Sequence, residues 1–172
     1  MIKMKLLLVA DVSANGKLLL TDNPNHPVPK ATIDFYLQKV IQAGNVIIGR
    51  STLEAFQQNF GEIQQIFPGA EVVVMSTTAH SASSYNVVHS PEEAVNYLQG
   101  KGFEEIVIGG GTQIYNVFLN KDMVTDIYFN YVPVIVGDGG ILGTAAGLLA
   151  NFDLVEHKLL DSNIVQVHLR KV

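Results

Sequence analysis

"EEIVIGGGTQIYNVFL", residues 104–119, passes from two glutamates through the apolar run Ile106–Ile108 into three consecutive glycines. Apolar side chains then recur every three or four residues, as on one face of a helix. The stretch therefore predicts a strand, a glycine turn and a helix over residues 112–120. A helix that starts beside glycines offers free N–H groups to a phosphate, although a glycine triplet after a strand is often only a tight turn.

The same order of apolar strand and amphipathic helix recurs before this stretch. Strands are expected at residues 5–12, 45–50, 70–78 and in "YNVVHS", and helices at residues 30–45, 51–60 and 90–98. Thr32 is a candidate cap for the first helix, and Ser51 with Glu54 forms a capping-box pattern for the second. Strands that alternate with helices indicate a parallel sheet covered on both faces.

The pattern changes in the last third of the chain. A β-rich run at residues 124–136 leads into a glycine-rich connector, and "FDLVEHKLL" and "NIVQVHLRKV" predict a terminal antiparallel hairpin. We therefore predict one α/β domain over residues 1–172, with a mixed, mostly parallel sheet, about four helices and antiparallel strands added at one edge. The apolar β surface of this third favours a homodimer.

Composition limits the function classes. Hydrophobic residues make up 48% and charged residues 16% of the 172 residues, which is typical of one folded domain with a sizeable core. The formal net charge of −5 and the lack of a Lys/Arg cluster disfavour nucleic-acid binding. Cysteine is absent, which excludes thiolate chemistry. No apolar run has the length of a membrane span or a signal peptide, so a cytoplasmic protein is expected.

Metal and hydrolase sites are also disfavoured. The His, Asp and Glu residues show no metal-ligand spacing, and Asp138 within "GDGG" is interpreted as a turn residue. A Ser-His-Asp hydrolase usually carries a G-x-S-x-G nucleophile elbow, and the chain has none.

Three apolar strands end in the same kind of polar or glycine turn. The turns are Gly49-Arg50-Ser51-Thr52, Ser76-Thr77-Thr78 and Gly109-Gly110-Gly111-Thr112. Ligands of open α/β sheets bind outside the carboxyl ends of the strands, and two of these turns lead into helix N-termini. Together they predict a site for a ligand with more than one phosphate. The pattern matches neither the G-x-G-x-x-G fingerprint nor the P-loop.

The same stretches resemble dihydrofolate reductases. "NVIIGRSTLEAF" resembles the second strand and following helix of that family, "VVVMSTT" the next strand, and "EEIVIGGGTQIYNVFL" the last nucleotide-binding strand, glycine pair and helix. Two segments are similar to the reductase domain of bacterial riboflavin-biosynthesis enzymes: "VADVSANGKL", with Asn15 in place of an Asp, and "VPVIVGDGGILG". The chain has no Trp, whereas folate reductases carry a Trp-containing loop before the first helix.

The resemblance implies an NADPH-dependent reductase that acts on a pyrimidine carrying a ribosylamino phosphate. A dihydrofolate reductase with an altered loop, a reductase of another substrate and a non-catalytic nucleotide-binding protein remain alternatives. The residues it assigns to the cofactor are Val9, Ala10, Gly49, Arg50, Ser51, Thr52, Ser76, Thr77, Thr78, Ile108, Gly109, Gly110, Gly111, Thr112, Gln113 and Ile114. Within this set, Ser76 and Thr77 with Arg50 would meet the 2′-phosphate.

Two acids are candidates for the catalytic position. The family places its substrate carboxylate early in the first helix, where Asp34 lies one position off the family's spacing. Asp34 either faces the pocket or favours the helix N-terminus. Asp11, on the first strand, lies beside the nicotinamide or is a solvated strand end. The resemblance also implies that the Gly109–Gly110 peptide bond is cis.

Overall fold

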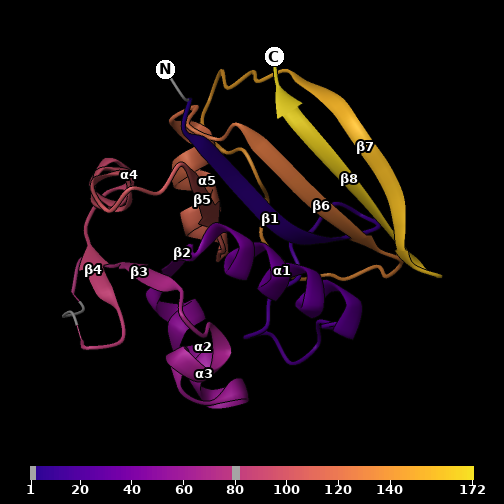
Figure 1. The fold of residues 1–172 in the computed structure, drawn as a ribbon. Helices are drawn as coiled ribbons and strands as arrows, with labels where there is room; N and C mark the ends of the chain where they lie inside the picture. Colours follow the sequence, from indigo (N-terminus) through magenta and orange to yellow (C-terminus); the bar gives the residue numbers. More distant parts are fainter. Residues whose placement is uncertain (1–2, 79–81) are drawn as a thin grey trace.

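The computed structural model describes residues 3–78 and 82–172, which form one layered α/β structure (Figure 1). Within these residues, eight strands form a single sheet in the order β4-β3-β2-β5-β1-β6-β8-β7. The strands are β1 (Lys5–Ser13), β2 (Asn45–Gly49), β3 (Glu71–Met75), β4 (Asn86–Val88), β5 (Glu105–Ile108), β6 (Asp126–Val132), β7 (Phe152–Asp161) and β8 (Ile164–Lys171).

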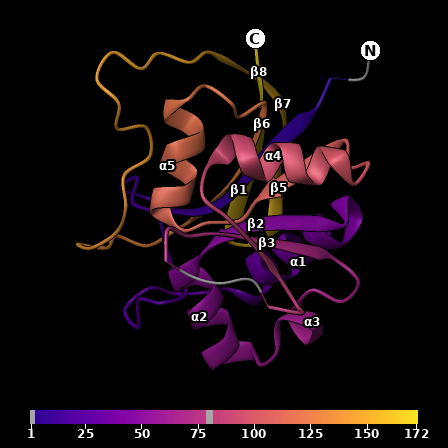
Figure 2. The same cartoon turned by 90° about the vertical axis from the view of Figure 1, so that its left-hand side faces the viewer.

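Helices cover both faces of this sheet, and Figure 2 shows α4 and α5 on the opposite side of the strands from α1, α2 and α3. The five helices are α1 (Lys30–Ala43), α2 (Arg50–Phe60), α3 (Ile63–Ile66), α4 (Pro91–Gly100) and α5 (Thr112–Asn120). Alternate strand residues belong to two separate apolar cores, because successive side chains of a strand point to opposite faces of the sheet. Leu8 and Phe118 belong to one core, and Val9 and Phe35 to the other.

The predicted fold class is confirmed, with one difference in the last third. The strands β4, β3, β2, β5 and β1 pair in parallel, and β7 and β8 form the antiparallel hairpin. However, β6 is parallel to β1 from Leu7↔Asp126 to Ser13↔Val132, and β8 is the first antiparallel neighbour. The reason is α5, which carries the chain from β5 back across one face before β6 starts, as in any parallel crossover.

Two predicted helix caps are wrong. The N-cap of α1 is Pro29, and the Thr32 hydroxyl lies inside the helix, where it donates to the Pro29 carbonyl at 3.0 Å. The N-cap of α2 is Gly49, and Glu54 accepts from the Arg50 side chain instead of closing a capping box with Ser51. In both cases the helix begins earlier in the chain than the capping pattern predicts.

The far edge of the sheet carries exposed apolar side chains. Leu154 and Leu159 on β7 are 57% and 65% exposed, and Val165 on β8 is 42% exposed. Dimer formation stays a prediction, and these strands belong to the apolar β surface on which it was based.

Among residues 3–78 and 82–172, no helix combines the length and apolar character needed to cross a membrane.

A buried carboxylate fixes β8 against β6. Asp126 is 3% exposed at its side chain, and its Oδ1 accepts from His168 Nε2 at 2.8 Å and from Arg170 Nε at 3.0 Å. Burial raises the pKa of Asp126, but the hydrogen bonds from His168, Thr125 and Arg170 outweigh it, so the pKa lies below its usual value of 3.8. His168 also stacks on Tyr128, with ring centroids 4.2 Å apart.

We expect Asp126→Asn to lower the free energy of unfolding by about 1–3 kcal/mol at pH 7, because hydrogen bonds to a buried charge are lost. The folded-state pKa is lowered, so the stabilisation is complete above 3.8 and is lost as the pH falls through the folded value. The difference between variant and wild type should therefore shrink in acid. Urea unfolding at several pH values measures it, with the exposed Asp153→Asn as control. A loss that persists unchanged at the lowest pH would contradict the ionic origin.

Candidate functional site

A cleft of about 890 Å³ lies at the carboxyl ends of the central strands. Its walls come from the ends of β1, β2, β3 and β5, the first turns of α2 and α5, and one face of α1. Cavities of a few hundred to about a thousand cubic ångströms are typical of small-molecule sites. The parallel topology thus brings segments that are far apart in the sequence to one edge of the sheet.

Most of the residues predicted from the sequence line this cleft: Val9, Asp11, Gly49, Arg50, Ser51, Thr52, Ser76, Thr77, Gly109, Gly110, Gly111, Thr112, Gln113 and Ile114. Four predicted residues do not. Ala10 and Ile108 are buried in the sheet, at 3% and 0% exposure. Thr78 is exposed and accepts from Arg50 Nη1 at 3.0 Å, so it holds the guanidinium from outside the cleft.

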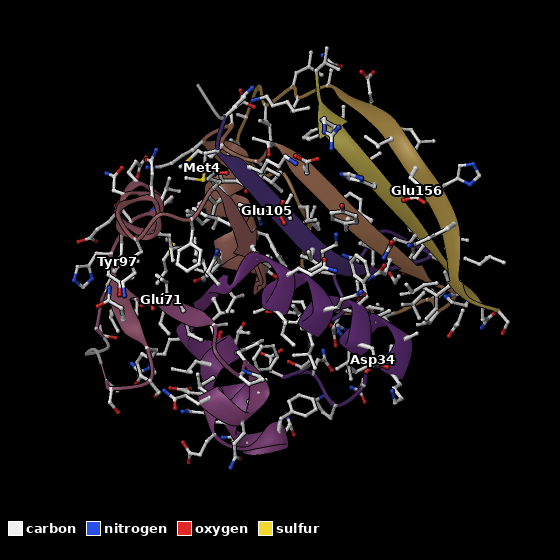
Figure 3. All side chains as sticks on the ribbon, in the orientation of Figure 1. Met4, Asp34, Glu71, Tyr97, Glu105 and Glu156 are labelled. Carbon is white, nitrogen blue, oxygen red and sulfur yellow. The ribbon has the colours of Figure 1, made fainter. Side chains whose placement is uncertain are left out.

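Asp34 is the fourth, and the structure does not support its predicted pocket role. Its carboxylate is 57% exposed and pairs with Lys30 one turn earlier on the surface of α1 (Figure 3). The residues of α1 that line the cleft are Thr32, Ile33, Tyr36 and Leu37. Consecutive residues of a helix are turned by about 100°, so the lining position next to Asp34 falls on Ile33.

Of the two acids predicted for the catalytic position, Asp11 is the one that lines the cleft. Its Oδ1 accepts from Asn130 Nδ2 at 3.0 Å, and Asn130 Oδ1 accepts from Gln166 Nε2 at 2.8 Å. These three residues are direct register partners across β1, β6 and β8, so their side chains form one row. Burial raises the pKa of Asp11, and the polar side chains of Thr32 and Asn130 oppose the rise without cancelling it.

Two tyrosine hydroxyls donate hydrogen bonds to backbone carbonyls near the ends of β5 and β1. Tyr36 Oη donates to the Gly109 carbonyl at 3.0 Å, and Tyr115 Oη donates to the Val9 carbonyl at 2.5 Å. Burial raises the pKa of both hydroxyls, so they act as fixed donors at neutral pH. The sequence analysis missed Tyr36, Tyr115 and Thr32. The i, i+4 spacing of Thr32 and Tyr36 on a helix next to the predicted site was the one signal available.

The glycine triplet joins two strand ends. Gly109 N–H donates to the Ile47 carbonyl and Gly49 N–H to the Gly110 carbonyl, both at 2.8 Å. A Cβ atom on Gly109 would lie 2.1 Å from Tyr36 Oη and 2.7 Å from Val46 Cγ2, so only glycine fits there. The cis peptide bond is Gly110–Gly111, one residue later than predicted. Counting from the start of the glycine run placed it too early.

The first turns of α2 and α5 line one edge of the cleft. Their N-caps are Gly49 and Gly111, and neither has a side-chain cap within the described residues. By contrast, Ser90 caps α4 by accepting from the Glu93 N–H. Two uncapped helix N-termini offer free N–H groups and the positive ends of two helix dipoles. They suit a ligand with more than one phosphate.

Arg50 adds a fixed charge to this edge. Its Nε donates to Glu54 Oε1 at 2.9 Å, and its Nη1 donates to Thr78 Oγ1 at 3.0 Å. The guanidinium still has further donors, because it carries five N–H groups. Gly111 lies beside Thr52: a Cβ on Gly111 would meet Thr52 Oγ1 at 3.4 Å and Leu20 Cδ2 at 3.8 Å, which are ordinary van der Waals distances. The turn before α5 and the first turn of α2 therefore line the cleft next to each other.

The comparison with protein families agrees with this arrangement. A family model described as dihydrofolate reductase matches residues 30–138, which is more than half of the chain. The chain belongs to the dihydrofolate reductase family. No curated protein sequence gives a significant match.

Three solved structures with the same fold cover nearly the whole chain. A protein of Shewanella sp. PV-4 named for riboflavin biosynthesis has a TM-score of 0.76 and 18% identity, over 98% of this chain and 99% of its own. The dihydrofolate reductase of Enterococcus faecalis, complexed with NADP(H) and RAB-propyl, has a TM-score of 0.72 and 16% identity, over 97% and 96%. A pyrimidine reductase-like protein of Corynebacterium diphtheriae has a TM-score of 0.73 and 12% identity, over 98% and 92%. At these identities the likeness concerns the fold.

Within residues 3–78 and 82–172, no group of three or more His, Asp or Glu side chains is arranged to hold a metal ion.

We expect Asp11→Asn to stabilise the free protein at pH 7 by about 1 kcal/mol, the scale of one poorly solvated polar group. The folded-state pKa of Asp11 is raised above 3.8, so the unfolded carboxyl ionises first as the pH rises and the wild type loses stability there. Below 3.8 both states are protonated and the two proteins should be equally stable. Thermal unfolding across pH measures this, with the exposed Asp34→Asn as control. Equal melting temperatures at all pH values would place the Asp11 carboxyl in a solvated site.

Proposed function

We propose that this protein is an NADPH-dependent reductase that transfers hydride to a planar heterocycle. One observation carries the proposal: two uncapped helix N-termini and Arg50 line one cleft, and the half-buried Asp11 lines the same cleft. The family membership supports reductase chemistry. NADPH would supply the hydride, so the protein needs position and a proton source rather than a nucleophile.

The nucleotide would lie along the helix N-termini. The turn Gly109–Thr112 and the first turn of α5 would hold the pyrophosphate from one side, and Gly49 to Thr52 from the other. Arg50, with Ser76 and Thr77, would bind the 2′-phosphate, since its guanidinium is already directed toward the end of β3 by Thr78. Ala10 and Ile108 would shape this site only through their backbone. The Tyr115 bond to the Val9 carbonyl would keep the end of β1 in place.

Asp11 would supply the proton. Its raised pKa favours the protonated acid, and Asn130 holds its Oδ1 from the sheet side. As the substrate C=N carbon receives hydride and its π electrons move to nitrogen, the carboxyl proton passes from Asp11 to that nitrogen. The Asp11 carboxylate then regains a proton from water at the mouth of the cleft. Asp34 has no part in this scheme, because it lies on the outer surface of α1.

The fold shared with the riboflavin-biosynthesis protein keeps a ribosylaminopyrimidine as a candidate substrate, and the fold shared with the Enterococcus enzyme keeps dihydrofolate. Asp11, Asn130 and Gln166 are linked by two hydrogen bonds. A protein that only bound a nucleotide would not need these three side chains. That row favours a catalytic protein.

We expect NADPH to bind with a dissociation constant below one millimolar, and Arg50→Ala to weaken it by about 10- to 150-fold. Loss of a charge-assisted hydrogen bond to phosphate costs about 1.5–3 kcal/mol. NADH, which has no 2′-phosphate, should lose less, and the NADPH-to-NADH ratio is the internal control. Fluorescence titration measures both. Equal weakening of the two nucleotides would place Arg50 away from the 2′-phosphate, and no NADPH binding in the wild type would overturn the proposed function.

We expect Asp11→Asn to lower kcat by about a hundred-fold, the lower range for loss of a general acid, with NADPH affinity unchanged within two-fold. The wild-type kcat should fall as the pH rises through the raised pKa of Asp11, and the variant should lack this fall. NADPH oxidation with the best acceptor from a panel of pterins and aminouracils measures it. Asp34→Asn is the matched control and should keep the wild-type rate and pH profile. An Asp11→Asn variant that does the same would exclude Asp11 as the acid.

A further inference from the structure

The charges that line the cleft are unevenly distributed. Among the described residues, the lining aspartates and glutamates are Asp11, Asp22 and Glu54, and Arg50 is the single lysine or arginine. His89 also lines the cleft, and its Nδ1 lies 2.7 Å from the Ser76 carbonyl, so it belongs with the end of β3. The permanent positive charge of the cleft is therefore confined to the part assigned above to the nucleotide.

A second part of the cleft is lined by aromatic rings, and it meets the first part at Tyr36, whose hydroxyl donates to the Gly109 carbonyl. Tyr36 of α1 lies 6.0 Å from Phe56 of α2 and 6.2 Å from Phe67, measured between ring centroids, and Phe60 lies 6.0 Å from Phe56. We call these four residues the aromatic end. Ile33, Leu37 and Ile66 also line the cleft and add aliphatic surface.

Arg50 cannot serve the aromatic end. It is the first residue of α2 and Phe60 is the last, so ten steps of about 1.5 Å place their backbones about 15 Å apart. The Arg50 side chain is also held at its own end by Glu54 and Thr78. The lysines of α1 do not replace it: Lys30 pairs with Asp34 on the surface, and Lys39 lies over the ring of Tyr128.

Asp11 sets the polarity of the aromatic end. Asp11 and Tyr36 both line the cleft, and the charge of Asp11 adds to burial in raising the pKa of the Tyr36 hydroxyl. A phosphate or carboxylate brought here would lose its hydration among apolar rings, find no lysine or arginine among the described lining residues, and meet a carboxyl group. An ion without a partner in such a site is strongly disfavoured. A neutral ring with N–H donors loses little hydration and gains stacking and a hydrogen bond to Asp11.

We propose that the substrate is an uncharged planar heterocycle with ring N–H groups and no phosphate or carboxylate, bound between the aromatic end and Asp11. This inference rests on the proposed reductase function and narrows it. It separates the protein from both substrates that its fold relatives bring to mind, since dihydrofolate carries a glutamate tail and the riboflavin-pathway ribosylaminopyrimidine carries a phosphate.

Two matched pairs of probes test the proposal in the presence of saturating NADP⁺, which has no hydride to transfer. One pair is 7,8-dihydrobiopterin and 7,8-dihydrofolate, and the other is 5-amino-6-ribosylaminouracil and its 5′-phosphate. Calorimetry on the NADP⁺-bound protein measures binding independently of turnover. The proposal holds if the uncharged member binds at least ten-fold more tightly in at least one pair and the charged member is preferred in neither. Every other result with NADP⁺-bound protein overturns it.

A charge-insertion variant tests the physical cause. Gln65 is exposed and lines the cleft next to Ile66, whereas Gln64 is exposed on the same short helix and does not line it. Gln65→Lys should tighten binding of dihydrofolate by about ten-fold, the scale of one partly exposed charge pair, and leave dihydrobiopterin within two-fold. Gln64→Lys, the control, should change neither. Equal effects of the two variants on dihydrofolate would overturn the charge argument.

The two failures can be told apart. If NADPH does not bind the wild type, the proposed reductase function is wrong, and the substrate class proposed here is wrong with it. If NADPH binds and the charged probes are preferred, the reductase function stands and the substrate class proposed here is wrong.

Discussion

The hydrogen bond from the Gly49 N–H to the Gly110 carbonyl, at 2.8 Å, fixes where the two halves of the cleft meet. Gly49 is the N-cap of α2, and Gly110 precedes Gly111, the N-cap of α5. This one contact therefore sets the relative positions of two helix N-termini whose residues are separated by about sixty positions in the chain. The Tyr36 hydroxyl holds the same turn from the other side through Gly109. Glycine is required at Gly109 because the ring of Tyr36 and the Val46 side chain fill the space where a Cβ would lie.

The cleft combines two opposite electrostatic environments within one cavity. Around the first turns of α2 and α5, backbone N–H groups and Arg50 favour negative charge, whereas the part lined by Phe56 and Phe60 has no lysine or arginine among the described lining residues. The helix α2 links the two parts, since it starts at Arg50 and ends at Phe60. The substrate class proposed above depends on this asymmetry.

The sequence predicted the fold class and most of the residues at the strand ends that line the cleft, because those features depend on local patterns. Apolar runs that end in Gly49-Arg50, Ser76-Thr77 and the glycine triplet are contiguous, and the parallel sheet brings such ends together. The substrate side could not be predicted in the same way. The choice between Ile33 and Asp34 depends on a rotation of about 100° of α1, and nothing in the helix sequence alone sets that rotation. Asn130 and Gln166 were missed because they reach Asp11 only through strand register, which no local pattern records. The antiparallel interpretation of β6 failed for a related reason, since the direction of a strand depends on the crossover before it.

The row Asp11–Asn130–Gln166 has a further consequence for how this protein tolerates change. Gln166 lies in β8, the last strand in sequence, yet it is two hydrogen bonds from a carboxyl group on the first strand. A change that displaces β8 would therefore also displace the side chains that position the Asp11 carboxyl. Fusions or subunit contacts on the edge hairpin would act on Asp11 across two strands. The helix α4 contributes no residue to the cleft, so it is the safer place for attachment.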